Sequence, residues 1–298
     1  MTAHDSATHP RGVAGNRGTA LAALGVLAFS LSFPATAWAL DGFGPWTATA
    51  LRGLLAALPA AACLAAGRVA IPARRHWPGI VAVAAGCVVG FPLLTTLALQ
   101  TSSTAHSAVV IGLLPLATAA WSAVRTGERP GRLFWCGAVA GAAAVLAFTL
   151  QQSHGSPTLA DGLLLGALLV CAAGYAEGGR LSRHMPGWQV IAWGVVAALP
   201  VSAATAALAL PAEPVHPTAR AVAGIAYVAA VSQFGGFVVW YRGMAAIGVA
   251  RASQLQLAQP IATLAWAALL MGEHVSPTAP LAAGAVALCI AATQRARN

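Results

Sequence analysis

Residues 115–128 read PLATAAWSAVRTGE and residues 260–273 read PIATLAWAALLMGE, so eight of these fourteen positions are identical without a gap. Both copies keep a proline, a tryptophan and a closing Gly-Glu pair in step, which chance similarity between alanine-rich helices does not produce. The tetrapeptide GAVA at 137–140 also recurs at 284–287. The two halves of the chain are therefore predicted to be copies of one ancestral segment.

The composition around these copies excludes a soluble protein. The chain has 298 residues, of which 58% are hydrophobic and 8% are charged, and its mean hydropathy is +0.75. A soluble globular chain carries about 25% charged residues. All sixteen basic residues are arginines, in small clusters between long uncharged stretches. This pattern is typical of a polytopic membrane protein, so the lipid bilayer is the expected partner, and nucleic acid is not.

The uncharged stretches are long enough to cross a membrane ten times. A crossing helix needs about 20 mostly apolar residues, and two of the predicted spans tolerate one internal charge. The expected ranges are 18–40, 45–66, 78–99, 105–124, 133–150, 161–181, 189–210, 219–243, 252–271 and 277–294. The predicted fold class is therefore an all-α polytopic membrane protein with ten transmembrane helices.

The arginines also predict which side of the membrane each loop faces. With ten helices, fourteen of the sixteen lie on one side, and the opposite loops hold Asp41, Asp161, Glu213 and Glu273. Arginine-rich loops stay in the cytoplasm, so we expect a multi-pass protein of the plasma (inner) membrane with both termini cytoplasmic. A signal peptide ending at 37–39 is the competing interpretation of the first helix, but its removal would break the repeat.

The expected domains follow from this topology. They are a polar cytoplasmic N-terminus (1–17), a first five-helix repeat (18–150), an extracytoplasmic linker (151–160), a second five-helix repeat (161–294) and a cytoplasmic C-terminus (295–298).

Five helices per copy is an odd number, so the two copies are expected to insert with opposite orientation. The charges agree, because three arginines surround the Gly127-Glu128 turn whereas no arginine adjoins Gly272-Glu273. Inverted repeats around a midplane site are the architecture of secondary transporters that work by alternating access. The sequence therefore predicts transport.

These features resemble the EamA family of the drug/metabolite transporter superfamily, over the whole chain beyond residue 17. The resemblance is carried by Phe33-Pro34, Arg52, the Ser-Ala run before Pro115, the Gly127-Glu128-Arg129 turn with the Gly137 helix, and the Pro260 to Gly272-Glu273 copy. It implies a central cavity lined mainly by the first, third, fourth, sixth, eighth and ninth helices, with the fifth and tenth at the periphery. It also implies that export of amino acids, other metabolites or drugs is a common activity.

Glutamines distinguish the predicted ninth helix from its copy, the fourth. Gln254, Gln256 and Gln259 stand where the fourth helix carries aliphatic side chains. Gln256, Gln259 and Thr263 share one helical face, and an amide in hydrocarbon is costly unless it is hydrogen-bonded. Its partner is either a neighbouring helix or a ligand, so Gln256 and Gln259 are candidate substrate-binding residues.

Acidic and aromatic side chains inside the predicted spans are further candidates for substrate binding. Glu177 is an acid well inside a span, and it either pairs with Arg180 or carries a proton beside Tyr175. Trp240 and Tyr241 either belong to an interfacial aromatic belt or line the cavity.

Mid-span prolines and one buried arginine are predicted to have structural or hinge roles. Pro34, Pro92, Pro115 and Pro260 each remove a backbone hydrogen bond, which kinks the helix and frees a carbonyl. Arg52 lies about 10 Å into the second helix. An unpaired charge at mid-membrane costs roughly 2.5–3.5 kcal/mol, so we expect a structural partner in the outer leaflet in preference to capture of a substrate carboxylate.

No catalytic residue, metal or cofactor is expected. The five cysteines lack CxxC spacing, and the sequence has no nucleotide-binding, HExxH or GxSxG motif. The favoured function is a secondary active transporter that exports small amphipathic metabolites, coupled to protons or to a counter-substrate. The alternatives are an importer or facilitative exchanger of the same fold, and a non-transporting membrane enzyme or receptor. The pattern does not specify an oligomeric state.

Overall fold

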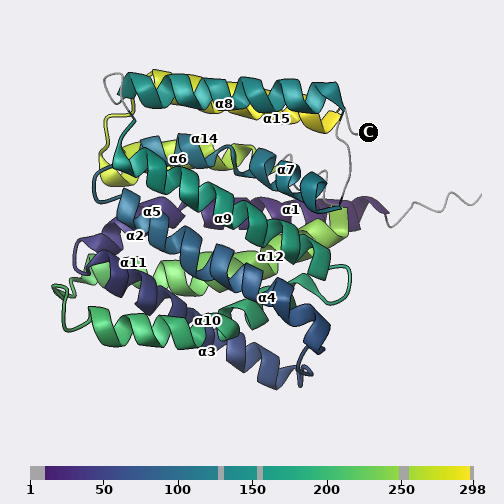
Figure 1. The fold of residues 1–298 in the computed structure, drawn as a ribbon, viewed down its shortest axis with the longest axis vertical. Coiled ribbons are helices and arrows are strands. Elements are labelled where there is room, and N and C mark those ends of the chain that lie inside the picture. Colours follow the sequence, from purple (N-terminus) through teal and green to yellow (C-terminus); the bar gives the residue numbers. More distant parts are fainter. Residues whose placement is uncertain (1–10, 127–130, 153–156, 248–254, 296–298) are drawn as a thin grey trace, which may run out of the picture.

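The computed structural model describes residues 11–126, 131–152, 157–247 and 255–295. Within these ranges every regular element is a helix, and the one strand-like contact is an isolated antiparallel bridge between Phe43 and Val215. The helices lie side by side with their axes roughly aligned (Figure 1). The predicted all-α class is therefore confirmed.

The helices follow one another along the chain in two runs of similar length. The first run is α1 (Arg11–Ser30), α2 (Ser32–Leu40), α3 (Pro45–Ala66), η1 (Arg74–His76), α4 (Trp77–Val83), η2 (Ala84–Gly90), α5 (Phe91–Ala98), α6 (Thr104–Ile111), α7 (Leu114–Thr126) and α8 (Arg132–Gln152). The second is α9 (Leu159–Leu181), α10 (Gly187–Ala209), α11 (Ala219–Tyr227), η3 (Val228–Gly235), α12 (Gly236–Ile247), α14 (Ala258–Met271) and α15 (Thr278–Arg295). The elements η2 and η3 are π-helical, and η1 is a 3₁₀-helix.

Seven helical stretches of the described chain are long and apolar enough to cross a membrane. They are Asn16–Leu40, Pro45–Ala66, Arg74–Ala98, Thr104–Arg125, Leu159–Leu181, Gly187–Ala209 and Ala219–Gly243. Three shorter apolar helices, Trp135–Phe148, Ala258–Met271 and Thr278–Cys289, lie where the remaining spans are expected. A multi-pass membrane protein is thus supported, and the count of ten crossings stays a prediction.

Three of the four predicted hinge prolines follow a helix break at a constant distance, whereas the helical backbone continues without a break from η2 through Pro92 in α5. The helix α1 ends at Ser30, four residues before Pro34, and α6 ends at Ile111, four residues before Pro115. Proline has no N–H, so the carbonyl four residues earlier loses its intrahelical donor. The helical turn before α14 likewise ends at Gln256, four residues before Pro260. Spans that the sequence predicts as continuous are therefore broken at equivalent places in the fourth and ninth helices.

The π-helical segments η2 and η3 occupy equivalent places in the two halves of the chain. Each is followed at once by a helix that begins with or next to a phenylalanine, Phe91 in α5 and Phe237 in α12. Gly86 in η2 lies so close to α9 that a Cβ there would clash with the carbonyl oxygen of Val170. The wider π turn thus coincides with close backbone packing, which the hydrophobic pattern does not predict.

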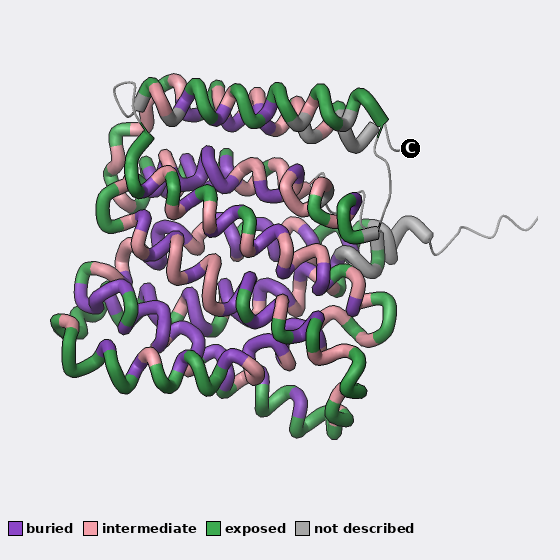
Figure 2. Tube along the Cα trace, viewed as in Figure 1, coloured by how far each residue is buried: buried purple, intermediate pink, exposed green. Residues whose placement is uncertain are grey.

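Most helix pairs join one half of the chain to the other. The pairs in close contact include α1 with α12, α3 with α10, α8 with α15, α2 with α11, and α9 with α7, α5 and η2. The α8–α15 pair lies along one edge (Figure 1) and is largely exposed, whereas buried residues gather in the helices between the edges (Figure 2). The core is therefore shared by the two halves.

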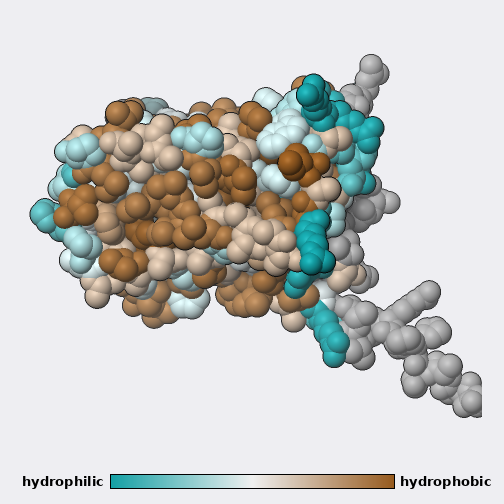
Figure 3. Space-filling view, turned by 90° about the horizontal axis from the view of Figure 1, so that it is seen from below, coloured by the Kyte–Doolittle hydropathy of each residue, from teal (hydrophilic) through white to brown (hydrophobic). Residues whose placement is uncertain are grey.

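The molecule has an arginine-rich end, which holds Arg74, Arg75, Arg125, Arg180 and Arg183. There the rings of His76 and His184 stack with centroids 5.5 Å apart, which joins the start of α4 to the α9–α10 loop. Strongly hydrophilic side chains gather at one end, beyond a broad hydrophobic face (Figure 3). This distribution is the one expected for a protein immersed in lipid.

The opposite, acidic end holds Asp41, Asp161, Glu213 and Glu273. The Glu273 carboxylate accepts hydrogen bonds from the backbone N–H groups of Thr104 (2.9 Å) and Ala105 (3.0 Å) at the start of α6. Glu213 does the same for the first amides of α3. Helix N-termini have unsatisfied N–H groups and favour negative charge. Glu273 therefore lies at the end of the bundle opposite Arg125, while the Gly127-Glu128 turn is outside the described residues.

Candidate functional site

A pocket forms where the breaks of the fourth and ninth predicted helices meet. Its lining includes Phe33, Gly112, Pro115, Gln256, Gln259 and Pro260, with two further residues from α15. In this conformation its cavity volume is about 20 Å³, which is room for about one water molecule, and the pocket is partly open to the surface. The structure thus brings together two of the predicted hinge prolines and both candidate glutamines.

The pocket has an apolar wall with a few polar groups. Among the described residues, neither the Gln256 nor the Gln259 side chain makes a hydrogen bond. Ile111 and Gln256 are also lining residues, and their backbone carbonyls have no intrahelical donor because the residues four positions later are Pro115 and Pro260. An apolar pocket with a few convergent polar groups is the usual form of a small-molecule site.

The third polar residue of this helical face has a different role. The Thr263 hydroxyl contacts the carbonyl oxygens of Ser30 (2.9 Å) and Gln259 (3.0 Å). The Trp266 indole N–H donates to the Ser30 hydroxyl over 2.9 Å. The sequence allows either a neighbouring helix or a ligand as the hydrogen-bond partner of this polar face. Thr263 bonds to a neighbouring helix, whereas the amides of Gln256 and Gln259 make no hydrogen bond to a described residue and are available to a ligand.

The aromatic candidates form a separate cluster between α1, α9 and α12. Phe237 lies 6.0 Å from both Tyr175 and Tyr241, measured between ring centroids. Phe29 lies 4.9 Å from Phe237 and 6.4 Å from Trp240. Trp240 is 6% exposed, so it is not part of a lipid-facing aromatic belt. None of the five rings lines the pocket.

Glu177 lies near the arginine-rich end, away from the pocket. Its two carboxylate oxygens accept hydrogen bonds from Nε of Arg125 (2.8 Å) and Nε of Arg180 (2.7 Å). The pairing with Arg180 is one of the two alternatives that the sequence allows. Arg125 is fifty-two residues distant along the chain, and no local pattern indicates it.

Arg52 is buried, and its hydrogen-bond partners are neutral. Its Nε donates to Oε1 of Gln233 (2.7 Å), and one terminal nitrogen donates to Oγ of Ser232 (3.1 Å). Gln233 in turn donates to the carbonyl of Cys87 in η2, and the Ser232 hydroxyl lies 2.7 Å from that of Ser32. Both partners of Arg52 belong to η3. The sequence analysis did not single out either residue. Gln233 is nevertheless an amide inside an apolar span, which is the feature that singled out Gln256.

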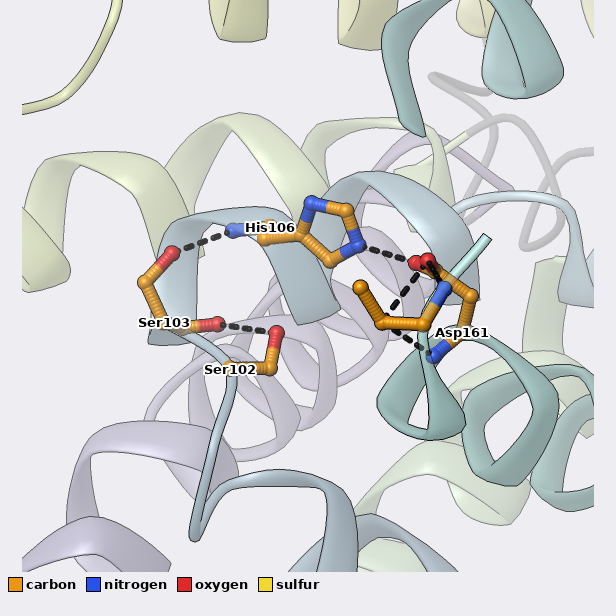
Figure 4. A network of polar contacts seen from close by, with 5 residues as sticks. Ser102, Ser103, His106 and Asp161 are labelled. Carbon is orange, nitrogen blue, oxygen red and sulfur yellow. Dashed lines mark hydrogen bonds and ion pairs between the residues drawn. The ribbon is translucent and has the colours of Figure 1, made fainter. Parts of the chain in front are cut away.

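A second polar network, which sequence reasoning also missed, closes the acidic end between α6 and α9 (Figure 4). Nε2 of His106 lies 2.6 Å from Oδ1 of Asp161. The Ser103 hydroxyl accepts from the backbone N–H of His106, and Thr158 and Asp161 form a capping box at the start of α9. This network fixes the starts of two helices, and none of its residues lines the pocket.

The described residues contain no group of three or more His, Cys, Asp or Glu that could hold a metal ion. The arrangement is suited to binding, because the pocket between the interrupted helices holds two amides that make no hydrogen bond to a described residue.

Comparison with known proteins agrees with this arrangement. Residues 16–150 and residues 158–293 each match the EamA-like transporter family. The chain is 42% identical over 272 residues to the Uncharacterized transporter YdeK of Bacillus subtilis (strain 168), a match that covers 91% of this chain and 95% of that protein. A protein of known crystal structure is similar over 93% of this chain and 97% of its own, with a TM-score of 0.65 at 20% identity, which shows the fold alone. The paired matches and the 42% identity show that the chain belongs to the EamA-like transporter family, a family of membrane transporters.

Proposed function

We propose that this protein is a secondary active transporter that exports small amphipathic metabolites, such as amino acids or drugs, across the plasma membrane by alternating access. The substrate binds in the pocket between the two broken helices. The coupling gradient is supplied by protons or by a counter-substrate.

The observation that carries this proposal is the pairing of two equivalent helix breaks around one pocket. The breaks at Gly112–Leu113 and at Leu257 each precede a proline, and both border the pocket. Interrupted helices expose backbone carbonyls only where they line a cavity or are buried in protein. Gln256 and Gln259 add side-chain hydrogen-bond donors and acceptors on the side of the pocket formed by the ninth predicted helix. A pocket that is polar on one side favours a polar or amphipathic substrate over a purely apolar one.

An inverted repeat with ten spans and cytoplasmic termini accounts for the rest of the arrangement. The pairs α1–α12 and α9 with η2 and α5 are equivalent contacts once the two halves are exchanged. Arg125 is near the end of α7, and Glu273 follows the end of α14, the equivalent helix of the second half. The two residues lie at opposite ends of the bundle, which supports opposite orientation of the two halves. Rocking one half against the other would open the pocket to each side in turn.

Counterflow in proteoliposomes tests the proposal. Vesicles with purified protein are loaded with an unlabelled amino acid or drug, and uptake of the labelled compound is measured against empty vesicles. We expect transient accumulation for at least one compound, reduced in Gln256→Leu and Gln259→Leu. Efflux from preloaded cells that exceeds uptake supports export; the reverse supports the importer alternative. Folded protein that exchanges no compound of the panel contradicts a transport function.

A further inference from the structure

We propose that Arg52, which is not among the residues that line the pocket, binds the carboxylate of the transported molecule. This inference rests on the proposed transport function and names a chemical class for its substrate. Arg52 is 6% exposed and lies inside the apolar span Pro45–Ala66. An arginine in such a position needs a counter-charge or full hydrogen bonding to offset the loss of water.

The counter-charge does not come from the described chain. Every described acid is engaged elsewhere: Asp41 with Arg220, Asp161 with His106 and Thr158, Glu177 with Arg125 and Arg180, Glu213 with the start of α3, and Glu273 with the start of α6. The two other acids of the sequence, Asp5 and Glu128, lie outside the described residues. Within the described ranges, Arg52 is thus a buried cation with no anionic partner.

The hydrogen bonds of Arg52 orient its guanidinium and leave part of it available. Nε and one terminal nitrogen donate to Gln233 and Ser232, and the other terminal nitrogen makes no hydrogen bond to a described residue. Guanidinium presents five N–H groups in a planar fork that matches a carboxylate. Two neutral acceptors hold the fork in place without neutralising its charge, so a carboxylate bound there would gain a charge-assisted hydrogen bond.

The Arg52 network is linked to the pocket through the break in the first predicted helix. Ser32, which contacts Ser232, directly precedes Phe33 in the pocket wall. On the pocket side, Thr263 donates to the carbonyl of Ser30 at the other side of the break. An anion bound by Arg52 and Ser232 would therefore act on the one-residue break at Leu31, which lies two residues before Phe33 of the pocket lining.

Matched pairs of ligands test the inference by binding alone. The purified protein in detergent is titrated with acetate, acetamide, phenylpropionate and phenylpropionamide at constant ionic strength, and thermal unfolding reports binding. We expect stabilisation by a carboxylate but not by its amide. In Arg52→Gln the apparent affinity should fall at least about tenfold, because a hydrogen bond to a charged group is lost. Arg52→Lys keeps the charge without the fork, so its loss should be smaller. Arg220→Gln, at the acidic end, is the matched control and should bind as the wild type does.

Each result of this titration either supports or overturns the carboxylate-binding role of Arg52. Stabilisation by phenylpropionate alone supports a carboxylate that belongs to a larger amphipathic substrate, whereas equal stabilisation by acetate overturns the assignment to the transported molecule in favour of a small-anion site. Equal stabilisation by acids and amides, no stabilisation by either acid, or unchanged affinity in Arg52→Gln and Arg52→Lys overturns the inference. If the inference is overturned but counterflow of uncharged drugs is still measured, the proposed transport function stands. Carboxylate binding without any counterflow would contradict transport alone.

Discussion

The hydroxyl of Thr263 lies 2.9 Å from the backbone carbonyl oxygen of Ser30, to which it donates a hydrogen bond. That carbonyl is the one that Pro34 leaves without a donor, since proline has no N–H to offer to the fourth residue before it. A side chain in the second half of the chain thus satisfies a backbone group freed by a break in the first half. The contact holds the break in its observed form.

Thr263→Val is therefore expected to destabilise the protein by about 1 kcal/mol, because valine keeps the shape but leaves the Ser30 carbonyl unpaired. Thr96→Val is the matched control. Thr96 is equally buried, and its hydroxyl donates to the carbonyl of Pro92 within its own helix, where the backbone N–H remains as a donor. Thermal unfolding in detergent should show a larger loss for Thr263→Val; equal losses would mean that the Ser30 contact adds nothing.

Opposite orientation of the two halves predicts opposite labelling of two loops. In a cysteine-free background, Gly131→Cys follows the Gly127-Glu128 turn, and His274→Cys follows Gly272-Glu273; both positions are exposed. A membrane-impermeant maleimide should label His274→Cys in intact cells and Gly131→Cys only after permeabilisation. Labelling of both from outside would contradict the inverted repeat.

Gln256→Leu and Gln259→Leu should each raise the KM for a polar substrate. One lost hydrogen bond to a neutral group costs about 0.5–1.5 kcal/mol, which corresponds to a two- to twelvefold change. Protein abundance and melting temperature should change little, because neither amide is bonded to a described residue. The KM in proteoliposomes and thermal unfolding are measured on the same preparations.

Gln151→Leu, on the exposed face of α8, is the control for these variants and should leave the KM unchanged. Destabilisation by Gln256→Leu or Gln259→Leu, with constant transport per folded molecule, would instead show that the glutamines hold helices together.

Glu177→Gln is expected to preserve pH-gradient dependence of transport. Two guanidinium groups within 2.8 Å stabilise the charged carboxylate, which favours a structural tie between α7 and α9 over a proton carrier. The Arg125 side chain is 62% exposed, so a double-mutant cycle with Glu177 should give a coupling energy of about 0.2–1 kcal/mol. Loss of gradient-driven transport with intact substrate exchange would restore the proton-carrier role.

Features that recur locally in the sequence were predictable. The duplicated motif indicates two equivalent helices, and Pro115 and Pro260 indicate where those helices break. The 3.6-residue period places Gln256, Gln259 and Thr263 on one face, and the pocket is lined by all three. Local backbone chemistry and helical period decide each of these features.

Contacts between distant segments were not predictable in the same way. Trp240 lies in an aromatic cluster because α12 packs on α1. From the sequence, its position near the end of a span was also compatible with an interfacial aromatic belt. The π-helical turns of η2 and η3 have no distinctive period. Arg52 depends on Ser232 and Gln233, which share neither motif nor periodicity with it.

The separation between Arg52 and its partners also sets an order of events during synthesis. Ser232 emerges from the ribosome 180 residues after Arg52, which at about 5–20 residues per second is a delay of about 9–36 seconds. Throughout that delay the α3 segment carries a charge whose native acceptors do not yet exist. A guanidinium in this state keeps its charged end in water or among lipid headgroups, so we expect α3 to take its final depth only after η3 is inserted. On this view the first half of the chain is inserted before it is fully folded, and its folding is completed by the second half.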